Sequence, residues 1–279
     1  GAVLGLPEPA GFTVATVQFR PDPGNPPANI GRIMGLIDKA AAMSEARGQP
    51  LDLVVLPELS TTGIIFDPVE AGKLGEEIPG PATEIFARAA AGKNIYIVLG
   101  MAESQGGKHY NSCVLIGPRG VECKYRKVHL SPRDQKWAEE GDSIFPVCDL
   151  PFGRIGLVAG CDLMFPECVE SLAKRGADLL CAPALWEDRR SKFIWEARLG
   201  EQTHLAIANQ WGDAGGFYAV GGSVIFGYSR YPEKMLRSES PAEGDGINVL
   251  RLNSADAREK KFLENIDYDA ILNNTPPGQ

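Results

Sequence analysis

Residues 51–58 read LDLVVLPE, and this short stretch decides the fold class of the chain. Its apolar residues follow one another without alternation, a pattern typical of a strand that is buried on both faces. The segment before it, residues 29–47, carries apolar residues at helical spacing and ends at Gly48. A further apolar run at residues 12–19 predicts a strand before that helix. The order strand, helix, strand predicts an α/β protein.

The same alternation of strands and helices continues along the rest of the chain. Further helices are expected at 82–92, 166–176, 188–203 and 254–263, and further strands at 94–102, 110–117, 121–128, 152–160, 177–184, 205–210, 221–228 and 247–253. No Pro- or Ser-rich linker separates the two halves. We therefore expect one domain over residues 1–279, in which two mixed sheets pack face to face between helices. This is a four-layer α-β-β-α sandwich.

Charge and composition exclude several classes of protein. The formal net charge of −8 argues against a nucleic-acid-binding surface, which normally carries a basic face. No apolar stretch approaches the length of a membrane span, and the first residues lack the features of a secretory signal. We expect a cytoplasmic protein that has no membrane partner.

The cysteines and histidines show no metal-binding or disulfide spacing, so no metal site is expected. Cys113, Cys123 and Cys181 lie in apolar or strand-like stretches. They are predicted to be buried, reduced thiols that pack as small apolar side chains.

Three side chains follow predicted strands, where the ligands of open α/β sheets usually bind. Glu58 ends the strand at 51–58, and partial burial there suits a general base. Lys127 ends the strand at 121–128 and offers a fixed positive charge to an oxyanion. Cys161 lies at a strand-to-helix turn, where a thiol is readily activated. Each also has a simpler interpretation: a solvated loop glutamate, a basic sheet edge and one more buried cysteine.

The segments around these residues resemble the nitrilase superfamily of carbon–nitrogen hydrolases. The matching segments occur in the family's order: LVVLPELSTTG (53–63), YNSCVLIGPRG (110–120), YRKVHL (125–130), CDLMFPE (161–167), RGADLLCAPALW (175–186) and GGSVIFG (221–227). The resemblance implies an α-β-β-α fold, a small-molecule substrate, no cofactor, and a homodimer or higher homo-oligomer. It also implies that a glutamate, here Glu58, deprotonates a cysteine, that Lys127 stabilises the tetrahedral intermediate, and that Glu201 has a structural role.

Two positions depart from the family pattern. Gly156 on one side and Asp162 on the other both place the family's nucleophile at Gly160, so that Cys161 is one residue late. In extended backbone, one residue turns a side chain to the opposite face, although a turn at a glycine is able to restore its direction. Asp134 stands seven residues after the lysine, where many members carry a second glutamate, so it is the expected auxiliary carboxylate.

Two hypotheses follow for the function. The first is a thiol-dependent hydrolase of a small amide or N-carbamoyl compound, with Cys161 as nucleophile; a nitrile substrate and acyl transfer have less support. The second is a catalytically impaired protein of the same fold that binds a ligand or partner. Loops 60–80, 131–143 and 185–192 are expected to wall the pocket. Phe66, Trp137 and Trp186 are candidates for its apolar lining, or are core or interface residues.

Overall fold

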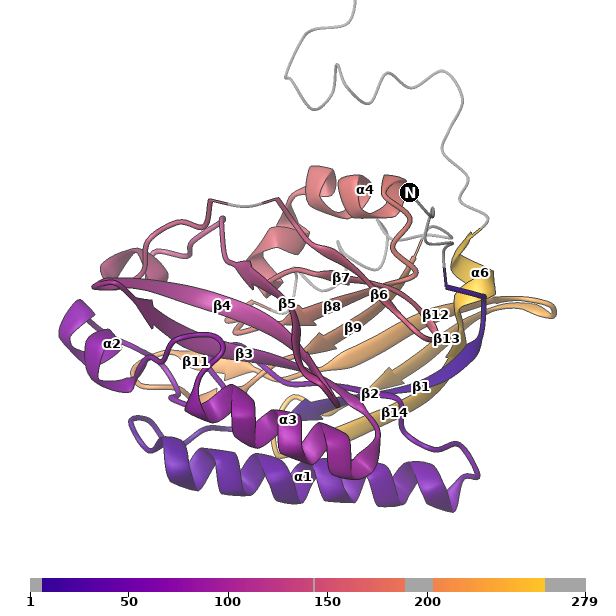
Figure 1. Ribbon diagram of the computed structural model, residues 1–279, viewed down its shortest axis with the longest axis horizontal. Helices are drawn as coiled ribbons and strands as arrows, with labels where there is room; N and C mark the ends of the chain where they lie inside the picture. The colour runs from indigo at the N-terminus through magenta and orange to yellow at the C-terminus, as the bar shows by residue number, and fades with distance from the viewer. Residues whose placement is uncertain (1–6, 143, 189–202, 259–279) are drawn as a thin grey trace, which may run out of the picture.

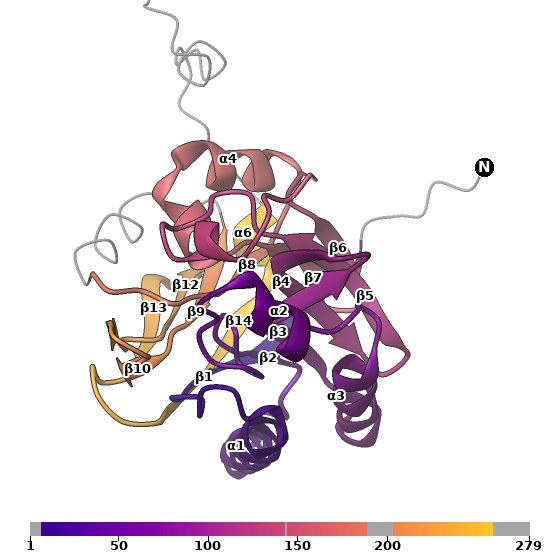
Figure 2. The same cartoon turned by 90° about the vertical axis from the view of Figure 1, so that its left-hand side faces the viewer.

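The computed structural model describes residues 7–142, 144–188 and 203–258, and it contains two six-stranded sheets. The sheets pack face to face, with α1 (Pro26–Ala46) and α3 (Pro81–Lys93) outside the first and α4 (Pro166–Lys174) outside the second (Figures 1 and 2). This arrangement confirms the predicted four-layer α-β-β-α sandwich. The predicted helix at 188–203 falls, apart from its two end residues, outside the described residues.

Both sheets are mixed and are built to the same plan. In spatial order the first comprises β14 (Gly246–Asn253), β1 (Gly11–Gln18), β2 (Leu53–Val55), β3 (Tyr96–Gln105), β4 (Lys108–Gly117) and β5 (Gly120–Arg126). The second comprises β6 (Val147–Leu150), β7 (Gly153–Leu157), β8 (Leu179–Pro183), β9 (His204–Ala208), β12 (Val224–Arg230) and β13 (Glu233–Glu239). Each sheet has one antiparallel pairing, then two parallel and two antiparallel pairings. The parallel strands are the apolar runs, as their burial from both sides requires.

Three apolar clusters hold the layers together. The central one joins residues of both sheets, such as Val55 and Leu157, and the outer two pack the sheets against the helices. In α1, Ile33 and Ile37 point into the cluster under the first sheet, which is why this helix has one apolar face. The parallel strands of the two sheets therefore bring their loops to a common end of the sandwich.

Several elements were not predicted from the sequence. They are α2 (Pro68–Leu74), the strand β6, the short hairpin β10 (Trp211–Asp213) with β11 (Tyr218–Val220), and the edge strand β13. β13 reads EKMLRSE and is largely exposed, so it lacks the apolar signal that marks the inner strands. The predicted C-terminal helix is present as α6 (Ser254–Arg258), and its remaining residues lie outside the described part of the chain.

The prediction for Cys123 was wrong. Cys123 on β5 forms a disulfide with Cys148 on β6. β5 and β6 are edge strands of different sheets, and stacking of the sheets brings these edges together. The sequence gives no sign of this contact because the two residues are 25 positions apart and pair only in three dimensions. Cys113 and Cys181 are buried free thiols, as predicted.

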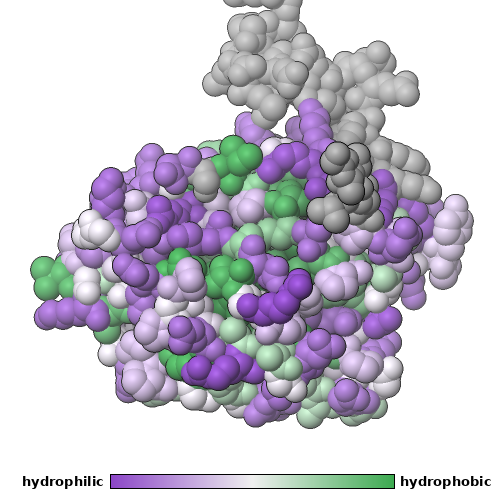
Figure 3. Space-filling view, in the orientation of Figure 1, coloured by the Kyte–Doolittle hydropathy of each residue, from purple (hydrophilic) through white to green (hydrophobic). Residues whose placement is uncertain are grey.

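The surface is mixed in character. On the face shown in Figure 3, apolar side chains form separate groups among hydrophilic ones. Within the described ranges, no helix is long and apolar enough to cross a membrane.

Candidate active site

The predicted site residues all follow strands at the same end of the sandwich. Glu58 lies just beyond β2, Lys127 directly follows β5, and Cys161 lies in the 3-10 helix η2 (Gly160–Met164) after β7. Asp134 begins a second 3-10 helix, η1 (Asp134–Lys136). Because β2 and β7 belong to different sheets, the site forms where the two sheets meet.

The backbone around Glu58 is fixed from several directions. The Glu58 N–H donates to the carbonyl of Ala184 (3.2 Å), and its carbonyl accepts from the Gln210 side chain (2.9 Å). A Cβ at Gly100 would lie 2.5 Å from the Glu58 Cα, so only glycine allows this close approach. Leu59 has a φ of +50°, a conformation that non-glycine residues rarely adopt and that often occurs at functional sites. The carboxylate is therefore held in one place.

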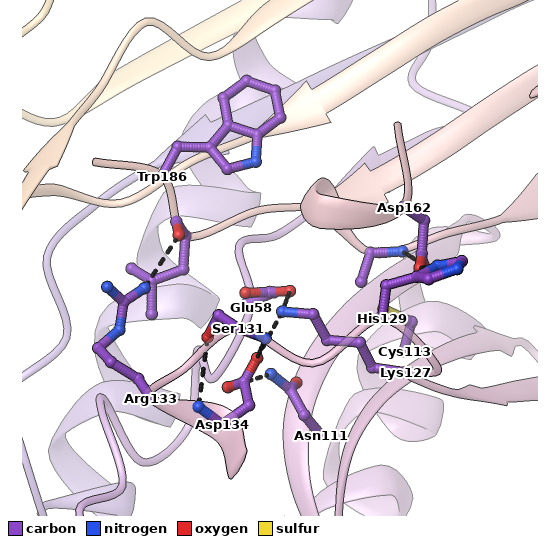
Figure 4. A network of polar contacts seen from close by, with 12 residues as sticks. Glu58, Asn111, Cys113, Lys127, His129, Ser131, Arg133, Asp134, Asp162 and Trp186 are labelled. Atoms are coloured by element: carbon purple, nitrogen blue, oxygen red, sulfur yellow. Dashed lines mark hydrogen bonds and ion pairs between the residues drawn. The ribbon is translucent and has the colours of Figure 1, made fainter. Parts of the chain in front are cut away.

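The Lys127 ammonium bridges two carboxylates (Figure 4). Its Nζ lies 2.8 Å from Glu58 Oε1 and 2.7 Å from Asp134 Oδ2. All three side chains are buried, with at most 6% of any one exposed to solvent. Removing three charged side chains from water costs free energy, and the ion pairs among them offset that cost. The structure thus brings together three of the four predicted site residues.

Burial and pairing set the protonation states of Glu58, Lys127 and Asp134. Burial raises the pKa of the Glu58 carboxyl to about 7, although the neighbouring Lys127 charge opposes the shift. Burial alone would lower the pKa of Lys127, but the charges of Glu58 and Asp134 raise it well above its ordinary value. Burial would raise the pKa of Asp134, but Lys127 and hydrogen bonds from Ser131 lower it. Near neutral pH, Glu58 is therefore the member that exchanges a proton.

Asp134 is oriented by neighbours that the sequence did not indicate. Its Oδ1 accepts a hydrogen bond from the Asn111 side chain (3.2 Å), and its Oδ2 accepts one from the Ser131 N–H (3.2 Å). In return, the Asp134 N–H donates to the Ser131 hydroxyl (3.2 Å). These contacts fix the Asp134 carboxylate against the Lys127 ammonium, which it holds in position.

A further carboxylate, that of Asp162, orders the turn that carries Cys161. Asp162 Oδ2 accepts the Ala159 N–H (2.8 Å) and the Tyr125 hydroxyl (2.8 Å). Asp162 Oδ1 lies 2.7 Å from His129 Nδ1 (Figure 4). The Tyr125 hydroxyl also accepts the Val128 N–H (3.0 Å), next to the lysine. This network links the end of β5 to the turn, so Lys127 and Cys161 are positioned together.

Gly160, the expected nucleophile position, faces a tryptophan. A Cβ at Gly160 would lie 2.2 Å from Trp186 Nε1 and 2.8 Å from the Ala184 Cβ. Contacts below 3.0 Å require a neighbour to move, and Trp186 is a bulky ring that is only 5% exposed. The indole therefore occupies the space that a side chain at Gly160 would need.

Cys161 is partly buried and lines a cavity of about 320 Å³. The cavity is also lined by Arg133, Met164, Leu185 and Trp186. Burial raises the pKa of the Cys161 thiol, and the charge of Lys127 opposes this shift. The thiol is thus an accessible group within the electrostatic field of the buried charges.

The predicted pocket walls are partly confirmed. Residues of 131–133 and 185–188 line the cavity beside Cys161, and Phe66 lines a neighbouring one. Trp137 is 4% exposed and packs with Leu59 and Ile65 in an apolar cluster, so it is a core residue. Glu201 lies outside the described residues.

Comparison with known proteins identifies the family. Residues 13–229 match the carbon–nitrogen hydrolase family. The chain belongs to this family. The assignment confirms the resemblance to the nitrilase superfamily.

Two curated proteins are similar to this chain in sequence. A nitrilase from Pyrococcus abyssi (strain GE5 / Orsay) is 36% identical over 252 residues, which cover 89% of this chain and 92% of the nitrilase. A formamidase from Bacillus cereus (strain Q1) is 33% identical over 175 residues, which cover 61% of this chain and 52% of the formamidase.

Solved structures of an amidase from Nesterenkonia sp. AN1 show the same fold. A cysteine-to-serine variant of that nitrilase-superfamily enzyme matches with a TM-score of 0.75 at 26% identity, over 98% of this chain and 99% of the amidase. A glutamate-to-glutamine variant matches with a TM-score of 0.76 at 24% identity, over 94% and 96%. In the latter, the acetamide moiety of fluoroacetamide is covalently added at that enzyme's active-site cysteine.

Proposed function

We propose that this protein hydrolyses the carbon–nitrogen bond of a small amide or N-carbamoyl compound, with Cys161 as its nucleophile. The observation that carries the proposal is the buried chain of Glu58, Lys127 and Asp134, joined by contacts of 2.8 and 2.7 Å. It provides a carboxylate that titrates near neutral pH beside a fixed positive charge. General acid–base catalysis and oxyanion stabilisation require such a pair.

In the first half of the proposed reaction, the Glu58 carboxylate takes the proton of the Cys161 thiol. The sulfur attacks the substrate's carbonyl carbon, and the oxygen becomes an oxyanion stabilised by the Lys127 ammonium. As the tetrahedral intermediate collapses, protonated Glu58 gives its proton to the leaving nitrogen. The carbon–nitrogen bond breaks, ammonia or an amine departs, and a thioester remains on Cys161.

In the second half, water replaces the amine. Glu58, again a carboxylate, takes a proton from the water as its oxygen attacks the thioester carbon. The new oxyanion is held by Lys127, the carbon–sulfur bond breaks, and the acid leaves while Glu58 returns the proton to sulfur. Asp134 keeps the ammonium in place throughout, because it contacts the side of Lys127 away from Glu58.

Ammonia release from formamide, acetamide and butyramide tests this proposal. Glu58→Gln preserves size but removes the base, and we expect a rate loss of about 100-fold or more. Cys161→Ala should abolish turnover. Cys181→Ala is the matched control, because it removes a buried thiol from β8 and should leave the rate within about twofold. Turnover that survives Cys161→Ala would exclude Cys161 as the nucleophile.

A specific observation favours a second candidate, a ligand-binding protein without hydrolytic activity. Trp186 fills the space beside Gly160, so the family's nucleophile position carries no side chain and has no room for one. On this alternative, the parent releases no ammonia from any small amide. Gly160→Cys alone should then fail to create activity, whereas Gly160→Cys combined with Trp186→Ala should create it. Robust turnover by the parent would exclude this candidate.

We also propose that the chain works as a homodimer or higher homo-oligomer. Exposed apolar side chains such as Tyr231 and Met235, at and beyond the turn between β12 and β13, support self-association. Light scattering on a sizing column measures the assembly, and a monomeric mass at micromolar concentration contradicts it. The Cys123–Cys148 disulfide argues against the cytoplasmic location expected from the sequence, because disulfides persist mainly in oxidising compartments.

A further inference from the structure

A second cavity lies on the other side of Arg133 from Cys161. Its volume is about 370 Å³, and its walls include the apolar side chains of Ile64, Phe66 and Phe217. Arg133 and Glu187 line both this cavity and the one that contains Cys161. The ion pair between Arg133 and Glu187 therefore stands at the boundary between the two cavities.

Arg133 is the better-fixed partner of this pair. Its guanidinium carbon lies 3.6 Å from the centroid of the Phe217 ring, a cation–π contact, and its Nη2 lies 3.4 Å from the Leu185 carbonyl oxygen. The Arg133 side chain is 24% exposed, whereas that of Glu187 is 51% exposed. Glu187 is therefore the partner that a ligand carboxylate would displace, while Arg133 stays in place.

The charges around the second cavity favour an anion. Among the residues that the structure describes, Arg133, Lys136 and Glu187 are the ionisable ones that line it. Without the Glu187 carboxylate, Arg133 and Lys136 would face the apolar walls of this cavity. The first cavity also contains Asp188, so the positive charge is concentrated on the side away from Cys161. Burial lowers the pKa of the Arg133 guanidinium, opposed by the charges of Asp134 and Glu58. A half-buried guanidinium of this kind gains most from a carboxylate, which matches its fork geometry.

We propose that the site selects small amides that carry a carboxylate at their far end, and that Arg133 determines this specificity. The substrate carboxylate replaces that of Glu187 on Arg133, with Lys136 as a second positive contact. The methylene chain lies along the apolar wall, and the amide end extends into the cavity with Cys161. The identity of the amide end rests on the proposed function, but recognition of the carboxylate by Arg133 and Lys136 does not.

Calorimetric titration of a Cys161→Ala protein measures this recognition without turnover. The ligands are malonamate, succinamate and glutaramate, each paired with its neutral diamide, which has almost the same shape. We expect at least one acid to bind tenfold or more tighter than its diamide, a difference typical of a carboxylate–guanidinium contact. Arg133→Gln should abolish this preference. Lys39→Gln, a change of the same charge on the exposed face of α1, is the matched control and should preserve it.

Glu187→Gln separates this proposal from a purely structural role of the ion pair. It removes the competing carboxylate, so the affinity for the acid should rise severalfold while that for the diamide stays unchanged. Equal affinities for every acid and its diamide, or no binding of either, would overturn the proposal. So would a preference that survives Arg133→Gln. Because binding is measured without turnover, a failure of hydrolysis in the parent leaves this result intact.

Discussion

Glu58→Gln should make the protein's stability less dependent on pH. Burial raises the pKa of Glu58 from 4.5 to about 7 in the folded chain. Between these values, the folded protein holds a proton that the unfolded chain has lost. Stability therefore falls as pH rises through this window. Glutamine has nearly the same shape and no titrating proton, so the variant lacks this loss.

The size of the effect follows from the shift. A displacement of about 2.5 pH units corresponds to about 3.4 kcal/mol, of which about 2.5 kcal/mol falls between pH 5 and pH 8. Equilibrium unfolding in urea at both pH values measures it, with parent and variant compared under the same salt. The free energy of unfolding of Glu58→Gln, relative to that of the parent, should be about 2.5 kcal/mol larger at pH 8 than at pH 5, which means that the variant gains relative stability.

Neighbouring groups interfere little with this comparison. The pKa of Asp134 is lowered and those of Lys127 and Cys161 are raised, so all three titrate outside the window. A difference between parent and variant that stays constant within about 0.5 kcal/mol would refute the reasoning, as would one of the opposite sign. Either result would mean that Glu58 is ionised throughout and is a poor proton acceptor.

Three other changes give separate tests. Gly160→Ala places a Cβ against Trp186, and thermal or urea unfolding should show a loss of about 1–3 kcal/mol; unchanged stability would mean that the indole moves freely. Cys123→Ser should lower the free energy of unfolding by about 2–4 kcal/mol. Alkylation of the denatured, unreduced parent should leave Cys123 and Cys148 unlabelled, and labelling of all six cysteines would disprove the disulfide. Asp134→Asn should destabilise the chain by about 3 kcal/mol, because the buried lysine loses one carboxylate, and a loss below 1 kcal/mol would contradict this contact.

Most of the fold could be predicted because its strongest signals are local. Continuous apolar runs such as 51–58 mark the parallel strands, and the helical spacing of 29–47 marks α1. The direction of parallel strands then brings Glu58 and the turn at Cys161 to one end of the sandwich. The edge strand β13 was missed because its residues are largely exposed and carry no such pattern.

The contacts that decide the chemistry could not be read from the sequence. Asp162 served only to fix the register, yet its hydrogen bonds to Tyr125 and Ala159 hold the turn. The approach of Trp186 to Gly160 joins segments from two different loops, so no local pattern reports it. The position of Arg133 between two cavities likewise depends on the packing of several loops that are far apart in the sequence.

Labelling with fluoroacetamide measures whether Glu58 activates the Cys161 thiol. A thiolate displaces fluoride and leaves an acetamide group on sulfur, which peptide mass spectrometry locates. We expect Cys161 to be labelled faster than Cys113 or Cys181. The rate of labelling should rise with pH through about 7 and fall at least tenfold in Glu58→Gln. Labelling of Cys161 at the same rate in parent and variant, or no faster than that of the two buried thiols, would contradict this expectation.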